Sequence, residues 1–298
     1  MAKNSKRGSL KYQIKKVLDQ KRAFGEPKHE DKRKNNQKPD PNKIYAATTY
    51  KNYMGHCMRF AVWVGEKYHC RSMEDARTHT GEYLYELVAG GKSEYTVRTV
   101  AAALAKAYDC ETTDLGCELP KRVRSNITQH RSEGATWRGE FSEKNNASLV
   151  AFARATGLRR HEIAKVMPKD IVQHADGTVT VAVIRGKGGK SRVVTALNGA
   201  AVLEIAARGA TFGMDKRMWG PDGTLGKIPS HAPIHEYRRA YAQKYYAQEV
   251  RNIHELVEKE LYRCRGDMAG IVYDRKAMYI VSTMLGHNRL DVVTHYLA

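Results

Sequence analysis

Apolar residues recur with a helical period between residues 45 and 109. The first helix presents an apolar face at i, i+4, i+7, i+8 and i+11, formed by Tyr53, Cys57, Phe60, Ala61 and Val64. A second helix is predicted over 73–87, before a Gly-Gly pair, and Ser93 is a favourable N-cap residue for a third. The pattern therefore predicts a small all-α domain of three or four helices.

The second half of the chain mixes helical and strand periods. A helix is predicted over 142–156, with Gly157 at its end. Residues 178–185 and 192–197 alternate in the manner of strands around the glycine-rich, basic segment 186–190, which predicts a β-hairpin. After the hairpin the chain is again mostly helical. We therefore expect this half to be an α+β domain, mainly α with a small antiparallel β-sheet.

The first 42 residues are polar and basic. A short helix is predicted from Ser9 to about Phe24, and the proline-containing stretch 26–41 is predicted to be a disordered linker. We therefore expect residues 1–42 to form a basic, largely flexible N-terminal extension with few residues that contribute to a core.

Charge is the strongest signal in the composition. The net charge is +19, and residues 1–38 carry 13 Lys and Arg against 4 Asp and Glu, so the remaining 260 residues hold +10. Such an excess repels itself unless a polyanion compensates it, which favours nucleic acid as the partner. An anionic membrane surface is a weaker alternative. A basic surface that serves only solubility, without a specific partner, is the other alternative.

Targeting signals and cysteines narrow the class of protein further. The sequence has no apolar run long enough to span a bilayer and no apolar N-terminal signal segment, which favours a cytoplasmic protein without membrane association. Five Cys are spread widely through the chain, and this odd number indicates reduced thiols rather than a disulfide framework. No cluster of His and Cys has the spacing of a metal site, so no metal is expected.

Four short clusters in the second half combine residue types that can act on a phosphate ester. In chain order they are Arg159 with Glu162, Lys187 at the hairpin tip, His235 with Arg238, and Leu285-Gly286-His287 with Tyr296 nine residues after the histidine. Each cluster alone is a weak signal, whereas the order and the spacing together are specific. The set resembles the motifs of the tyrosine recombinase, or phage-type integrase, family, and the resemblance covers residues 155–296.

The resemblance implies an enzyme that cleaves and rejoins DNA strands without a metal ion, ATP or another cofactor. Tyr296 would attack a backbone phosphate and form a 3′-phosphotyrosine link, which frees a 5′ hydroxyl. The resemblance also implies a helical core-DNA-binding domain over 43–125, a basic interdomain linker over 126–140 and a catalytic domain over 141–298.

The chemistry of strand cleavage explains why these residue types occur together. Arg159 and Arg238 offer paired donors that keep their charge, which suits a phosphate that becomes a dianion in the transition state. A phenol has a pKa of about 10, so Tyr296 attacks well only where positive charge stabilises its phenolate. Lys187 is the candidate general acid for the departing 5′ oxygen, and Lys190 competes for this role.

Other residues are expected to support cleavage and binding. His235 and His287 would hydrogen-bond the phosphate oxygens, and Glu162 would orient its neighbours. The predicted DNA-binding side chains are Lys121, Arg122, Arg124, Lys190 and Arg192. Arg238 and His287 are 49 residues apart, which is long for the family, so 241–279 is predicted to hold an insertion with an extra helix over about 253–261 and a loop around Gly266.

The family resemblance favours a site-specific recombinase that integrates and excises a mobile element in bacteria, associated with the nucleoid. The expected partners are double-stranded DNA recombination sites, a homotetramer in the synaptic complex and an accessory directionality factor. A chromosome-dimer resolvase fits the basic N-terminal segment less well. A type IB topoisomerase-like enzyme and a non-catalytic DNA-binding regulator with the same fold are the alternative functions.

Overall fold

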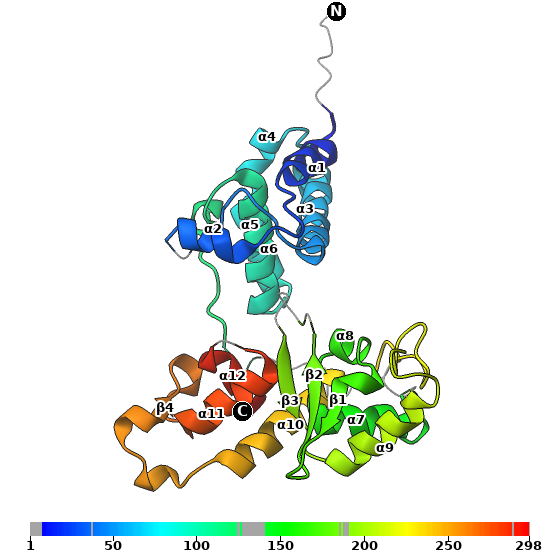
Figure 1. Cartoon of the computed structure of the whole chain (residues 1–298). Helices are drawn as coiled ribbons and strands as arrows, with labels where there is room; N and C mark the ends of the chain where they lie inside the picture. Colours follow the sequence, from blue (N-terminus) through cyan, green and yellow to red (C-terminus); the bar gives the residue numbers. More distant parts are fainter. Residues whose placement is uncertain are drawn as a thin grey trace, which may run out of the picture. The chain divides into compact units, whose positions relative to one another are not determined.

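The chain divides into two compact units, Met1–Thr128 and Gln129–Ala298, which are described separately (Figure 1). The computed structural model describes residues 8–36, 38–123, 126, 141–184, 186, 191–287 and 289–297. No helix in these ranges is long and apolar enough to cross a membrane.

The N-terminal unit is all-α. Its elements are α1 (Leu10–Gln20), α2 (Lys28–Lys34), α3 (Ala47–Tyr68), α4 (Met73–Arg77), α5 (Thr80–Ala89), α6 (Glu94–Tyr108) and the short 3-10 helix η1 (Thr112–Leu115). The long helices α3 and α6 pack against each other, as Figure 1 shows. The predicted apolar face of α3 is confirmed, because Cys57, Phe60, Ala61 and Val64 are buried in the core of this unit.

The helix predicted after Ser93 is also confirmed, and the one predicted over 73–87 is split. Ser93 caps α6 by accepting a hydrogen bond from the Thr96 amide at 3.3 Å. The split lies between α4 and α5, where the Thr80 hydroxyl donates to Leu115 O at 3.0 Å. A Cβ on Gly81 would lie 2.4 Å from the Gly116 carbonyl oxygen. Close packing against η1 therefore decides where α5 begins.

The extension predicted over 1–42 is not separate from the helical domain in its described part. Leu10, Ile14 and Leu18 lie at i, i+4 and i+8 of α1 and are buried in the same core as α3. The Ile44 amide donates to Lys21 O at 2.6 Å, which ties the segment after α1 to the start of the domain. The apolar face of α1 has only three buried residues among many charged ones. The sequence pattern therefore did not reveal that this helix joins the core.

The disordered linker predicted over 26–41 is wrong over α2, which is a helix of seven residues. The carboxylate of Asp31 in α2 accepts hydrogen bonds from the Tyr45 hydroxyl at 2.7 Å and from Lys43 Nζ at 3.0 Å. These contacts with residues beyond the prolines hold the helix in place, and they are not visible in the local sequence.

The C-terminal unit contains an antiparallel sheet of three strands in the order β1-β2-β3, with β1 (Ile171–Gln173), β2 (Val179–Val183) and β3 (Arg192–Thr195). The predicted hairpin of β2 and β3 is confirmed, with Val181 opposite Val194. Strand β1 was not predicted, because its three residues are half-buried or exposed and show no alternation. It forms because Ile171 can pair with Val181 along the free edge of β2.

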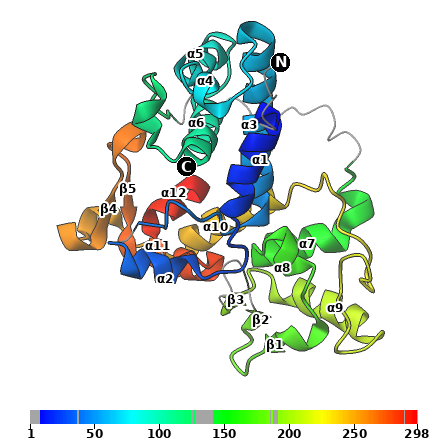
Figure 2. The ribbon, with the colours of Figure 1, turned by 90° about the horizontal axis from the view of Figure 1, so that it is seen from above.

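Helices surround this sheet and supply most of the core. They are α7 (Ala147–Thr156), α8 (Arg160–Ile163), α9 (Gly199–Ala210), α10 (Ile234–Glu249), α11 (Arg275–Leu285) and α12 (Leu290–Leu297), with 3-10 turns η4 (Lys144–Asn146) and η5 (Pro168–Asp170). Helix α9 packs on β1 and β2, whereas α11 contacts β3. Figure 2 shows α10, α11 and α12 side by side. The helix predicted over 142–156 begins only at Ala147, after η4.

The extra helix predicted over 253–261 is wrong. The segment holds 3-10 turns η7 (Ile253–Glu255), η8 (Glu258–Glu260) and η9 (Gly266–Met268), and an antiparallel pair of β4 (Leu261–Arg263) and β5 (Val272–Asp274). Arg251 binds the buried Asp274 carboxylate through Nε and Nη2, both at 2.8 Å, and Glu260 through Nη1 at 2.6 Å. This network joins the two ends of the segment. The segment therefore folds back as a strand pair and does not form a helix.

Candidate active site

The first site segment begins where α7 ends. Gly157 has φ +59°, and a Cβ there would lie 2.5 Å from the Tyr241 ring, so both the backbone and the packing require glycine. The chain then turns so that Arg159 directly precedes α8 and Glu162 lies one turn later. Glu162 Oε2 accepts from the Arg159 amide at 2.9 Å, and Oε1 accepts from Arg159 Nη1 at 2.8 Å. Glu162 therefore holds both the backbone and the side chain of Arg159.

Glu162 is a buried carboxylate that stays ionised. Burial alone would raise its pKa, but the hydrogen bond from Arg192, the Arg159 amide and the charges of both arginines outweigh burial and lower the pKa to about 2. Arg192 binds both carboxylate oxygens, with Nη1 3.0 Å from Oε1 and Nη2 2.8 Å from Oε2. The negative charge is thus fixed between two guanidinium groups.

Arg238 occupies the centre of the site. It lies on α10 and is fully buried, and it donates from Nη1 to Gly157 O at 2.6 Å and from Nη2 to Leu285 O at 2.5 Å. Burial lowers its pKa to about 10, so the guanidinium remains charged at neutral pH. The two carbonyl groups come from the first and the last site segments, and Arg238 therefore joins the ends of the catalytic motif set.

The third and fourth clusters meet at Arg238. Helix α11 ends at Gly286, with φ +65°, and the His287 amide donates back to Ser282 O at 2.8 Å, which is a Schellman-type end. His287 Nε2 lies 3.3 Å from Arg238 Nη2. The hydroxyl of Tyr296, on α12 of the same chain, lies 3.4 Å from Arg238 Nε, and its ring centroid is 5.5 Å from that of His287.

The remaining predicted catalytic residues are His235 and Lys187, with Lys190 as the competing lysine. His235 lies on the first turn of α10, one turn before Arg238, and its side chain is exposed. Lys187 and Lys190, on the tip between β2 and β3, lie outside the described residues. Among the described residues, no group of three or more His, Cys, Asp and Glu could hold a metal ion.

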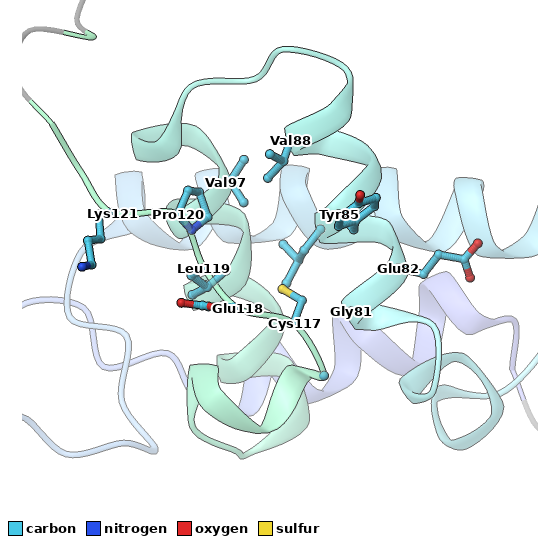
Figure 3. A pocket seen from close by; sticks show the side chains of 12 residues that line it. Gly81, Glu82, Tyr85, Val88, Val97, Cys117, Glu118, Leu119, Pro120 and Lys121 are labelled. Carbon is cyan, nitrogen blue, oxygen red and sulfur yellow. The ribbon is translucent and has the colours of Figure 1, made fainter.

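The predicted DNA-binding side chains fall into two kinds. Lys121 and Arg122 are exposed on the N-terminal unit, and the Arg122 guanidinium lies 5.3 Å from the centre of the Tyr95 ring. Lys121 also lines a cavity of about 790 Å³ between α5, α6 and the segment after η1, with Tyr85, Val88 and other apolar side chains along it (Figure 3). Arg124 lies outside the described residues.

Arg192 differs from the prediction. Its side chain is 9% exposed and is held by Glu162, and its Nε donates to Met284 O at 2.8 Å. A guanidinium enclosed in this way has little exposed surface left for a DNA contact. The strand pattern showed that residue 192 begins a strand, but it did not show what the side chain meets.

Arg160 is a further residue that the motif analysis passed over. Its Nη1 donates to Pro229 O at 2.6 Å and its Nη2 to Ala232 O at 2.8 Å, with longer bonds to Ile228 O and Ser230 O. These bonds fix the loop that leads into α10, and so they fix the position of His235 and Arg238. The only sequence signal for this role was the adjacent pair Arg159-Arg160. The pair alone does not show which of the two arginines contacts the loop before α10.

The fold was compared with known proteins. No protein-family model matches the chain, and no curated protein matches its sequence. The structure is similar to that of the XerH site-specific recombinase in a post-cleavage complex with a palindromic difH substrate, with a TM-score of 0.53 and 15% identity over 96% of this chain and 89% of that one.

A second similar structure is the Tn1549 transposon integrase in complex with transposon right end DNA, with a TM-score of 0.50 and 10% identity over 98% of this chain and 95% of that one. The predicted α+β class, with an all-α N-terminal domain, agrees with this likeness. The chain has the fold of the tyrosine recombinases and integrases.

Proposed function

We propose that the protein is a site-specific DNA recombinase that cleaves and rejoins DNA strands through a covalent 3′-phosphotyrosine intermediate at Tyr296. The observation that carries this proposal is the approach of the Tyr296 hydroxyl to within 3.4 Å of Arg238 Nε, across 58 residues of sequence and beside His287. The order of the sequence motifs and the fold shared with DNA-bound recombinases support it.

The cleavage step transfers a phosphoryl group between two oxygens. The Tyr296 oxygen forms a bond to the phosphorus of a backbone phosphate and loses its proton, and the bond from phosphorus to the 5′ oxygen breaks. Arg159 and Arg238 stabilise the charge that develops on the non-bridging oxygens, since guanidinium groups donate in pairs and remain charged. His235 and His287 donate further hydrogen bonds to these oxygens.

The departing 5′ oxygen takes a proton from a general acid, for which we propose Lys187, with Lys190 as the competing residue. In the reverse direction a 5′ hydroxyl attacks the phosphotyrosine, gives its proton to the same lysine and restores the phosphodiester. Because the covalent link conserves the energy of the bond that was cut, rejoining requires no ATP and no other cofactor.

The burial of Arg238 adds a requirement to this mechanism. Its guanidinium is fully buried, and the Tyr296 ring lies over it, with 5.4 Å between the ring centroid and Cζ. A DNA phosphate that reaches this guanidinium must displace the Tyr296 ring, which α12 carries. We therefore propose that binding of DNA moves α12 before cleavage.

The proposed partners are two double-stranded DNA recombination sites, held by a homotetramer of this chain, with an accessory directionality factor. XerH was solved with a difH substrate and the Tn1549 integrase with transposon right end DNA, and the net charge of +19 favours the same polyanion here. We propose a bacterial, nucleoid-associated enzyme that moves a mobile element, and the likeness to a transposon integrase supports the mobile element. A type IB topoisomerase-like activity is the second candidate, because it uses the same cleavage chemistry.

A covalent-adduct experiment tests the proposal. The probe is a pool of nicked duplexes with a randomised core. Cleavage beside the nick releases a short strand with a 5′ hydroxyl, which diffuses away. Rejoining is then impossible, so the covalent adduct accumulates. We expect an SDS-stable adduct in the presence of EDTA, with the phosphate mapped to Tyr296 by mass spectrometry. Tyr296→Phe should abolish the adduct, and the matched control Tyr279→Phe, at an exposed tyrosine of α11, should keep it.

The outcomes separate the candidate functions. Joining of two labelled duplexes to each other indicates a recombinase, whereas relaxation of a supercoiled circle without joining indicates a topoisomerase-like enzyme. DNA binding without any adduct, in the wild type as in Tyr296→Phe, would leave a non-catalytic regulator as the function.

A further inference from the structure

Arg192 is enclosed between two parts of the candidate active site. It begins β3, directly after the hairpin tip, and its side chain is 9% exposed. All three of its nitrogens donate to protein acceptors, two of them to the Glu162 carboxylate and one to Met284 O. These protein acceptors account for the burial of all three nitrogens.

The contact with Glu162 connects Arg192 to the first site segment. The Glu162 carboxylate accepts four hydrogen bonds, two from Arg192 and two from Arg159, at 2.8 to 3.0 Å. The carboxylate is therefore a shared acceptor whose position depends on both arginines. If one guanidinium is removed, the other remains as the only counter-charge of this buried carboxylate.

The contact with Met284 connects Arg192 to the last site segment. Met284 lies in the final turn of α11, and the residue after it, Leu285, accepts a hydrogen bond from Arg238. A Cβ on Gly286 would lie 3.0 Å from Arg192 Nη1 and 3.1 Å from its Cδ, so the chain passes directly against the guanidinium. The backbone that sets His287 is thus packed on Arg192.

We infer that Arg192 is a positioning residue, which ties the segment of Arg159 to the segment of His287. It does not touch the reacting phosphate and does not bind DNA. Its planar guanidinium suits this task, because its three nitrogens point at a carboxylate on one side and a carbonyl on the other. A lysine keeps the charge and cannot make these bonds together.

Loss of the guanidinium should misplace the site without removing a substrate contact. Arg159 would then be drawn fully onto Glu162, and the turn at Gly286 would lose the group packed against it. Groups that orient the ligands of metal sites commonly change activity about 10- to 100-fold when they are altered, and we expect an effect of the same order for a group that orients Arg159 and His287. The effect should appear in the rate of the chemical step and not in DNA affinity.

The first arm of the test compares Arg192→Lys with a matched control, Arg251→Lys. Arg251 also binds a buried carboxylate through two nitrogens, that of Asp274, but it lies outside the site. The inference rests on the proposed function here, since the readout is the rate of adduct formation on a nicked duplex recovered from the randomised pool. We expect Arg192→Lys to lower this rate about 10- to 100-fold and Arg251→Lys to change it little.

Binding of the same duplex separates positioning from DNA contact. A lost phosphate contact lowers the slope of log affinity against log salt by about 0.9. We expect the slope and the affinity of Arg192→Lys to match those of the wild type. A slope reduced by about 0.9, or an unchanged rate of adduct formation, would overturn the inference.

The second arm needs no catalysis. Hydrogen exchange of the Gly286 and His287 amides, which donate to Thr283 O and Ser282 O, reports on the turn that Arg192 supports. We expect faster exchange there in Arg192→Lys and Arg192→Met, and wild-type exchange there in Arg251→Lys. Exchange equal in all variants would overturn the inference. If the wild type forms no adduct, the proposed function fails, and this arm still decides whether Arg192 positions the turn.

Discussion

The two units of the chain bury different kinds of side chain. In the described part of the N-terminal unit the core is apolar, and Lys21 is the charged residue among the buried ones, paired with Asp109 at the surface. The C-terminal unit buries Glu162, Arg238 and Asp274. Charges in a protein interior cost desolvation energy that apolar residues of the same volume would not.

The buried charges of the C-terminal unit indicate that its packing has a role besides stability. Helix packing in the N-terminal unit follows from apolar faces, which any similar set of residues could supply. In the C-terminal unit, Arg238 is held by atoms from three segments. Glu162 is held by Arg159 of its own segment and by Arg192 of β3, and these contacts fix its acceptors in space. Strongly perturbed groups of this kind concentrate at functional sites. The difference between the units therefore supports the proposal that the C-terminal unit carries the catalytic site and the N-terminal unit binds DNA.

Removing a buried carboxylate should affect the C-terminal unit most. Glu162→Gln leaves two guanidinium groups facing each other without a counter-charge, and we expect it to lower the free energy of unfolding by about 3 to 5 kcal/mol. The matched change Glu82→Gln, at an exposed bridge to Lys67 in the N-terminal unit, should have little effect, since solvent screens such pairs. Peptide-resolved hydrogen exchange in urea measures the two units separately. Equal losses of unfolding free energy in the two units would contradict the expected difference between them.

Acid should destabilise the C-terminal unit before the N-terminal one. The pKa of Glu162 is lowered from 4.5 to about 2 on folding, so its contribution to stability is complete above the unfolded pKa and is lost as the pH falls toward the folded one. The full loss corresponds to about 3 kcal/mol. Urea unfolding between about pH 5 and about pH 3 checks this. Glu162→Gln should reduce the pH dependence and leave the share of Asp274, because the hydrogen bond from Arg251 also holds the pKa of that carboxyl below its usual range. A pH dependence as large in this variant as in the wild type would assign it to carboxylates other than Glu162.

The exposed charges of the N-terminal unit should act on binding and not on stability. Lys121→Gln and Arg122→Gln should each lower the salt slope of DNA binding by about 0.9, with the thermal midpoint unchanged. Lys67→Gln is the matched control, because Lys67 is paired with Glu82 and Glu86 and should contact no phosphate. Salt titrations of fluorescence anisotropy give the slopes. A slope that only Lys67→Gln changes would place the DNA surface elsewhere on this unit.

Local periodicity predicted the elements whose partners lie close in sequence. The apolar face of α3, the Ser93 cap of α6 and the hairpin of β2 and β3 depend on neighbouring residues, and the structure confirms them. The interpretation failed where distant partners decide. Strand β1 needs the edge of β2, and the segment between α10 and α11 is shaped by Arg251 and Asp274.

The sequence by itself determined which side chains are candidates for the site, their order and the chemistry that such a set can perform. It could not determine which arginines face a substrate, because a spacing reports only the period of one element. The partners of Arg238 lie 81 and 47 residues away, and the carbonyl that holds Arg192 lies 92 residues away. Only packing of β3 and α10 against α11 brings these atoms together, and this packing turns Arg192 inward and carries Tyr296 to Arg238.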